Sequence, residues 1–130
     1  LAPPLNLNPH WLGAHPSYTL SKYGMTLLSL GWAEEFRQER DGAGIGFSCL
    51  WPETYIATSA VANLDSKLIS ASRSPEIMGD AAVEILSRPS AEVNGRCYMD
   101  SAVLAEAGVE DLSRYGGGDH PILDIFVDKS

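Results

Sequence analysis

Apolar residues recur at intervals of three and four positions between residues 17 and 40, and this spacing predicts a long helix. A helix with two apolar stripes needs cover on both sides. We therefore expect one stripe to pack on a sheet and the other on a second subunit, in a homodimer or homotetramer built through helix 17–40. One stripe contains Met25, Leu28, Trp32 and Phe36, and the other contains Leu20, Leu27 and Leu30.

A second helix is predicted over residues 74–87. Ser74 is a candidate N-cap, and Pro75 occupies the first turn, where a missing N–H is tolerated. The pattern therefore indicates an amphipathic helix with one buried side. Its expected buried stripe consists of Ile77, Met78, Ala81, Ala82, Ile85 and Leu86.

Two short apolar runs, residues 45–51 and 94–100, predict strands, the second one after an Asn-Gly turn. Strands that are separated by helical segments are typical of an α/β fold with a parallel sheet. Parallel sheets are covered on both faces and need more than two strands to be stable. We therefore expect residues 1–130 to be part of a larger sheet.

The remaining segments carry weaker signals. Residues 1–16 include four prolines and predict a loop. We expect a loop that leads into a short helix over residues 53–64 and an irregular polar stretch over 65–74. Over residues 101–130 we expect a short helix followed by an extended tail.

Composition excludes several classes of function. The chain has 130 residues, 45% of them apolar, which suffices for one folded domain. Its net charge of −8 argues against binding to nucleic acid and to anionic membranes. No apolar run approaches the roughly 20 residues of a membrane helix. Cys49 and Cys97 both lie in predicted strands, so we expect buried free thiols and a cytoplasmic location.

The candidate chemistry lies in the spacing of Tyr18 and Lys22, which are four residues apart in a predicted helix and so face the same way. A phenol has a pKa near ~10, and a nearby ammonium lowers it by favouring the phenolate. Such a pair can pass a proton to or from a hydroxyl or carbonyl oxygen. The alternative is an exposed helix face without chemistry, since a Tyr-x-x-x-Lys match alone is weak.

Three segments in order resemble the short-chain dehydrogenase/reductase family, in its hydroxysteroid-dehydrogenase-like and citronellol-dehydrogenase-like branch. They are SYTLSKYGMTLLSLGWAEEF from residue 17, GIGFSCLWPETYIATSAV from residue 44 and SPEIMGDAAVEILSRPSAEVNGRCYMD from residue 74. The resemblance implies the C-terminal half of a Rossmann-type doubly wound parallel sheet, a three-layer α/β/α fold. It also implies NAD or NADP as cofactor.

The resemblance also implies roles for particular residues. Tyr18 would be the acid/base, and Lys22 would hold the nicotinamide ribose and tune Tyr18. Pro52, Ile56 and Thr58 would lie along the nicotinamide side of the cofactor. The implied reaction interconverts an alcohol and a carbonyl on an apolar alcohol, aldehyde or ketone substrate.

The chain departs from the family pattern in three places. Glu53 follows Pro52 where the family has glycine. The family's catalytic serine either lies before Leu1 or is replaced by Ala2. The glycine-rich turn that cradles a pyrophosphate is absent from residues 1–130. These departures keep open a non-catalytic, oligomerising or ligand-binding relative, or a piece that is inactive by itself.

Other polar and aromatic residues give weaker hypotheses. His10 and His15 precede Tyr18 and either contact substrate or are ordinary surface histidines. Trp11, Trp51 and Tyr55 either line an apolar substrate pocket or belong to the core. Asp100 is interpreted as a helix cap, and no spacing of His, Cys, Asp or Glu indicates a metal site.

Overall fold

The computed structural model describes residues 1–39 and 44–128 and divides into two compact units. The first unit comprises Leu1–Trp51 and Ile85–Tyr98, and the second comprises Pro52–Glu84 and the chain from Met99 onward. Helices and a parallel pair of strands confirm the α/β class. In the first unit the helices are α1 (Pro9–Ala14), α2 (Pro16–Glu39) and α5 (Ser90–Val93).

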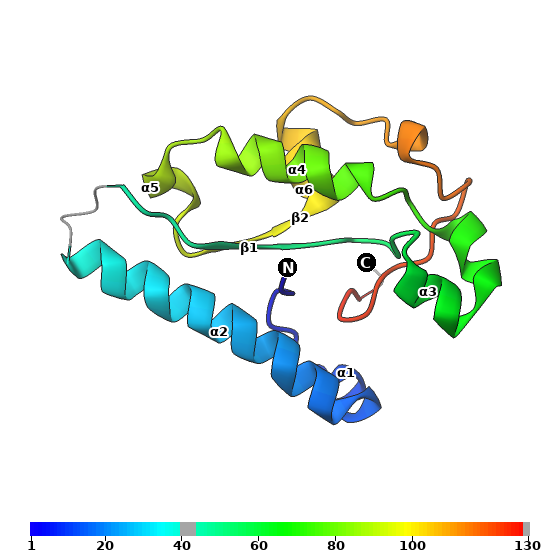
Figure 1. Cartoon of the computed structure of the whole chain (residues 1–130), viewed down its shortest axis with the longest axis horizontal. Helices are drawn as coiled ribbons and strands as arrows, with labels where there is room; N and C mark the ends of the chain where they lie inside the picture. The colour runs from blue at the N-terminus through cyan, green and yellow to red at the C-terminus, as the bar shows by residue number, and fades with distance from the viewer. Residues whose placement is uncertain (40–43, 129–130) are drawn as a thin grey trace. The chain divides into compact units, whose positions relative to one another are not determined.

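The sheet of the first unit pairs β1 (Ser48–Trp51) with β2 (Arg96–Met99). Figure 1 shows the two strands running in the same direction, with α2 along one side of β1. The start of the chain also reaches β1, because the N–H of Ala2 donates to the carbonyl of Leu50 over 3.2 Å. The buried apolar residues of this unit include Ala2, Tyr23, Ala33, Cys49, Leu50, Trp51, Ile85, Val93 and Tyr98.

Asn94 ties the beginnings of both strands to α2. Its Nδ2 donates to the carbonyl of Ala33 over 2.8 Å, and its Oδ1 accepts from the N–H of Phe47 over 2.9 Å. Gly95 follows with φ of +73°, a conformation that favours glycine, and its N–H donates to the carbonyl of Phe47. The predicted Asn-Gly turn therefore sets where β2 begins.

The second unit is mainly helical, and isolated backbone bridges join its irregular segments. Isolated bridges join Thr54 to Leu123, Ile56 to Arg73 and Arg73 to Gly116. Its core consists of Ile77, Ala81, Val103, Leu104, Tyr115 and Phe126. Its elements are α3 (Ser59–Leu64), η1 (Ser66–Ala71), α4 (Glu76–Leu86, ending in the first unit), α6 (Asp100–Glu106) and η2 (Ser113–Tyr115).

The structure differs from the sequence expectations in three segments with weak signals. Residues 1–16 contain α1, which begins because Asn8 Oδ1 accepts from the N–H of His10 and proline is tolerated at the first helical position. The polar stretch 65–74 contains η1, capped by the Asp65 carboxylate. The tail is not extended throughout, since Phe126 turns at φ of +68° and is buried.

The predicted helices and strands exist, with corrected bounds and burial. The end of the first predicted helix, residue 40, lies outside the described residues. The buried side of α2 is formed by Thr19, Tyr23, Thr26 and Ala33, whereas Met25, Leu28 and Trp32 of one predicted stripe and Leu20 and Leu27 of the other are exposed. Leu86 of the expected α4 stripe is also exposed. Cys49 is a buried free thiol as predicted, but Cys97 is exposed because it lies on the open side of β2.

Candidate active site

Tyr18 and Lys22 lie one turn apart near the beginning of α2, on the same side of the helix. Lys22 Nζ is 5.6 Å from the centroid of the Tyr18 ring. Tyr18 is 41% exposed, so its phenol is accessible from solvent, while Lys22 is half-buried. The structure thus places a lysine ammonium beside the ring of an accessible phenol.

The buried side of α2 fixes how the helix is rotated and therefore where this pair points. Thr26 Oγ1 donates to the carbonyl of Pro3 over 2.7 Å, and the Tyr23 hydroxyl donates to the carbonyl of Asn6 over 2.6 Å. Successive helix positions are rotated by about 100°, so Tyr18 and Lys22 fall beside this buried side rather than within it. The segment before α1 thus orients the candidate pair.

Trp51 borders Lys22 from the sheet. The Lys22 ammonium lies 5.5 Å from the centroid of the Trp51 ring, at the end of β1. Tryptophan rings attract cations, so Trp51 favours a charged lysine at this place. The sequence offered no spacing signal for this contact, because Trp51 and Lys22 lie 29 positions apart and only the packing of α2 on β1 joins them.

The histidines before Tyr18 have local contacts within the first unit. The His10 ring packs edge-on against Trp11 with centroids 4.7 Å apart. The carbonyl of His15 accepts from the N–H of Thr19, which makes His15 part of the entry into α2. Both imidazoles are exposed, and their contact with a substrate remains a prediction.

The other candidate residues, Pro52, Ile56 and Thr58, belong to the second unit. Pro52 is buried, and the backbone at Ile56 bridges to Arg73. Thr58 is the N-cap of α3, where its Oγ1 accepts from the N–H of Val61 over 3.4 Å. The Thr58 hydroxyl still has its hydrogen to donate. The structure therefore brings Tyr18 and Lys22 together with Trp51, and it describes Pro52, Ile56 and Thr58 within their own unit.

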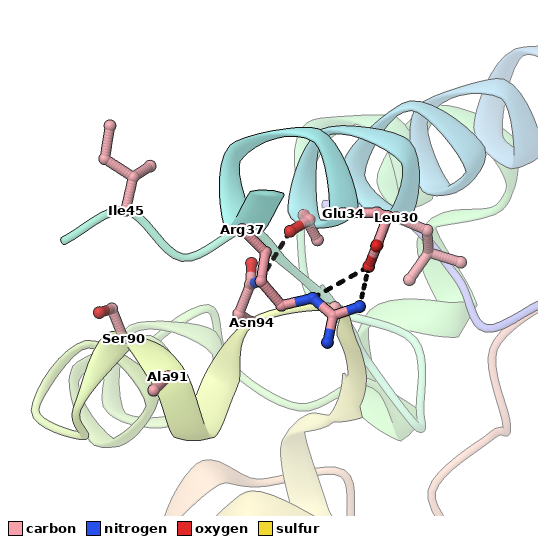
Figure 2. A pocket seen from close by; sticks show the side chains of 9 residues that line it. Leu30, Glu34, Arg37, Ile45, Ser90, Ala91 and Asn94 are labelled. Carbon is pink, nitrogen blue, oxygen red and sulfur yellow. Dashed lines mark hydrogen bonds and ion pairs between the residues drawn. The ribbon is translucent and has the colours of Figure 1, made fainter. Parts of the chain in front are cut away.

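A hollow of about 410 Å³ lies at the other end of α2, within the first unit. Figure 2 shows Glu34 and Arg37 paired at its edge, with Ser90, Ala91 and Asn94 across from them. Leu30 and Arg37 follow Lys22 by two to four helical turns, so the hollow is separate from the Tyr18–Lys22 pair.

No three His, Cys, Asp or Glu side chains gather within residues 1–39 and 44–128 in a way that could hold a metal ion. Over the same ranges, every helix is too short or too polar to cross a bilayer.

Curated proteins match the chain along its whole length. The chain is 41% identical to hydroxysteroid dehydrogenase-like protein 2 of Xenopus tropicalis, covering 100% of this chain and 30% of that protein. It is 42% identical to the protein of the same name from Rattus norvegicus, covering 99% of this chain and 24% of the relative. The chain thus spans about a third or less of the curated relatives it matches. No family model matches it.

Two solved structures share the fold. A candidate dehydrogenase from Xanthomonas campestris superposes with a TM-score of 0.88 at 44% identity, covering 99% of this chain and 47% of that one. A short chain dehydrogenase from Mycobacterium thermoresistibile gives a TM-score of 0.83 at 44% identity, covering 98% of this chain and 45% of that one. These matches confirm the resemblance that the three sequence segments indicated.

Proposed function

Because the chain matches short-chain dehydrogenases in sequence and fold, we propose that the polypeptide containing it is an NAD(P)-dependent oxidoreductase that interconverts an alcohol and a carbonyl on an apolar substrate. The observation that carries the proposal is the Tyr18–Lys22 pair, with Nζ 5.6 Å from an exposed phenol ring and flanked by Trp51. The aromatic rings of Tyr18 and Trp51 close to Lys22 suit an apolar substrate better than a charged one.

In the proposed reaction, Tyr18 is the acid/base. For carbonyl reduction its hydroxyl donates a proton to the substrate oxygen as carbon receives a hydride, and the phenolate then takes a proton from solvent. For alcohol oxidation the same groups act in reverse. Lys22 stabilises the phenolate by its charge, and Trp51 keeps the ammonium beside Tyr18. NAD(P), when bound, supplies or accepts the hydride.

Some side chains of this chain offer hydrogen-bond donors that could bind NAD(P). Lys22 offers three N–H donors to ribose hydroxyls, and the Thr58 hydroxyl has a hydrogen to donate. The N–H groups of Tyr55 and Ala57 donate to the carbonyls of Ile122 and Arg73, so the segment from Pro52 through Ile56 to Thr58 is held by the chain itself. We propose that this segment borders the nicotinamide. No Gly-x-Gly-x-x-Gly occurs in the 130 residues.

The wider proposal follows the same resemblance. We assign the chain to the C-terminal half of a three-layer Rossmann domain, and we retain a cytoplasmic location and a homodimer or homotetramer formed through α2. The exposed apolar side of α2 supports the oligomer, because a helix face with Leu20 at 76% exposure suits burial by another helix.

The test of this function is the Tyr18→Phe variant of the full-length polypeptide. The variant lacks the phenol hydroxyl, so kcat for alcohol and carbonyl substrates should fall about 10²- to 10⁴-fold, which is the contribution of general acid–base catalysis. Binding of NAD(P) should stay within about threefold, measured by titration calorimetry. Tyr115→Phe is the matched control, because its hydroxyl bonds Asp80 in the second unit. Turnover retained by Tyr18→Phe would reject the role of Tyr18.

A second candidate is a non-catalytic, oligomerising or ligand-binding module. The observation that favours it is Ala2, which is buried beside β1 and has no hydroxyl, together with Glu53 in place of glycine. Wild-type protein that binds nucleotide but turns over no alcohol, aldehyde or ketone in the same assay would support this module over the enzyme.

A further inference from the structure

Asp100 is the most deeply buried charged residue of the second unit, with no exposed surface. It follows β2 directly and is the first residue of α6. Burial raises the pKa of Asp100 above its ordinary value, so the fold keeps this carboxyl at an energetic cost. A buried carboxyl is retained where its hydrogen bonds and neighbouring charges offset that cost.

The carboxyl joins two distant parts of the chain. Asp100 Oδ1 accepts from the N–H of Ser101 over 2.7 Å, which is a local helix-start bond. The same oxygen accepts from the N–H of Glu53 over 2.9 Å. Glu53 lies 47 positions earlier and directly follows the proline that ends β1. The N-cap of α6 is Met99, so Asp100 is not the helix cap that the sequence suggested, and its bond to the N–H of Glu53 requires another explanation.

Arg73 faces the same segment from the other direction. Its charge opposes the rise in the pKa of Asp100, and its Nη1 lies 4.0 Å from Glu53 Oε2. The backbone of Arg73 accepts from the N–H of Ala57 over 2.8 Å and donates to the carbonyl of Tyr55 over 2.9 Å. Asp100 and Arg73 together hold the segment from Glu53 to Ala57 at three backbone groups.

Several buried polar atoms around Asp100 and Arg73 make no hydrogen bond among the described residues. Asp100 Oδ2, Thr54 Oγ1 and the Nε and Nη1 of Arg73 are buried without a hydrogen-bond partner among the described residues. A buried polar atom without a hydrogen-bond partner destabilises the folded state, so a fold selected for stability alone would favour apolar residues here. The cluster therefore suggests a role in fixing the backbone.

We propose that Asp100 is a positioning residue, which holds the segment Glu53–Thr58 in the conformation that the nicotinamide side of the cofactor requires. This inference rests on the proposed function, because it gives that segment its role. Asp100 does not contact substrate in this proposal. It acts through the N–H of Glu53.

The experiment compares Asp100→Leu and Asp100→Asn in the full-length polypeptide. Hydrogen exchange of peptides covering residues 52–58 is measured by mass spectrometry, and NAD(P) affinity by calorimetry. Asp100→Leu removes the acceptor, so exchange should accelerate about tenfold and cofactor Kd should rise about tenfold, with kcat at saturating cofactor changing less. Asp100→Asn keeps an acceptor oxygen of the same shape and should restore both values to within about threefold.

Asp111→Leu is the matched control, since Asp111 also accepts a backbone N–H, that of Ser113, but is exposed and has no hydrogen bond to Glu53. Asp111→Leu should change neither the hydrogen exchange of residues 52–58 nor the Kd for NAD(P). If Asp100→Leu does not fold, Asp100→Glu, whose longer side chain displaces the carboxyl, should show the same two changes in weaker form.

Unchanged exchange over residues 52–58 in a folded Asp100→Leu or Asp100→Glu variant overturns the inference, and so does faster exchange with an unchanged cofactor Kd. Wild-type protein that binds no NAD(P) overturns the proposed function instead. The exchange measurement needs no cofactor, so the two failures are distinguishable.

Discussion

Single hydroxyl groups decide the orientation of the candidate pair. Thr26 is completely buried, and its Oγ1 donates to the carbonyl of Pro3, while Tyr23 bonds the carbonyl of Asn6. A buried carbonyl without a partner costs about 1–3 kcal/mol. Polar residues therefore occupy the side of α2 where apolar periodicity alone would lead one to expect leucine.

Cys97 gives a pH-dependent prediction. Partial burial and the neighbouring Cys49 thiol raise the pKa of Cys97 from 9.0 to about 11. An unfolded chain ionises this thiol near pH 9, while the folded chain keeps the proton to about pH 11. The unfolded state thus binds fewer protons in this window, and the free energy of unfolding falls as pH rises from about 9 to about 11.

Urea unfolding of the full-length polypeptide at a series of pH values from 8 to 11 measures this slope. Cys97→Ser should make it shallower and leave the midpoint at pH 7 nearly unchanged. Parallel slopes for the variant and the wild type would contradict the assignment. Other groups that ionise between pH 8 and 11 contribute equally to the slopes of the variant and the wild type, so the difference between the slopes reports on Cys97.

Helix α2 has its apolar residues on the sides that the described chain leaves open. Leu20 is 76% exposed and Leu27 is 57% exposed, while the side against β1 carries threonine, tyrosine and alanine. Small and hydrogen-bonded side chains allow the start of the chain to lie close to the helix. The apolar spacing consequently identified a helix correctly, but neither of the two predicted apolar stripes forms its buried side.

This exposure predicts the effect of Leu27→Glu on assembly. If α2 packs against α2 of a second subunit, a carboxylate there is buried without a partner, and association of the full-length polypeptide should weaken at least about tenfold. Light scattering coupled to size exclusion measures the change. Leu64→Glu, at a 75% exposed leucine on α3, is the control and should leave the assembly as it is. Equal behaviour of both variants would rule out α2 as the interface.

The chain as a whole consists of two compact units, and the sheet of the first unit has two strands. Parallel strands need neighbours and cover on both faces. Several leucines on α2 and Leu86 on α4 remain exposed, so the residues 1–130 leave much apolar surface in water.

Residues 1–130 expressed alone should therefore lack a cooperative thermal transition as a monomer. Circular dichroism during heating, with the mass checked by light scattering, measures this, and the full-length polypeptide is the control that should unfold cooperatively. A sharp thermal transition of monomeric residues 1–130 would contradict this prediction, because it would show that the two units fold stably by themselves.

Local patterns in the sequence determined much of this protein. The 3.6-residue spacing located α2 and α4, the Asn-Gly turn located the start of β2, and the order of helices and strands gave the α/β class. Tyr18 and Lys22 could be paired from sequence because four residues make one helical turn. Each of these depends on interactions between near neighbours in the chain, which the sequence displays directly.

Tertiary structure alone decided the contacts between distant residues. Hydrogen bonds to the carbonyls of Pro3 and Asn6 rotated α2. Packing placed Trp51 beside Lys22, and it brought Asp100 to the N–H of Glu53. Contacts of this kind depend on how the chain is folded back on itself, and no spacing along the sequence records them.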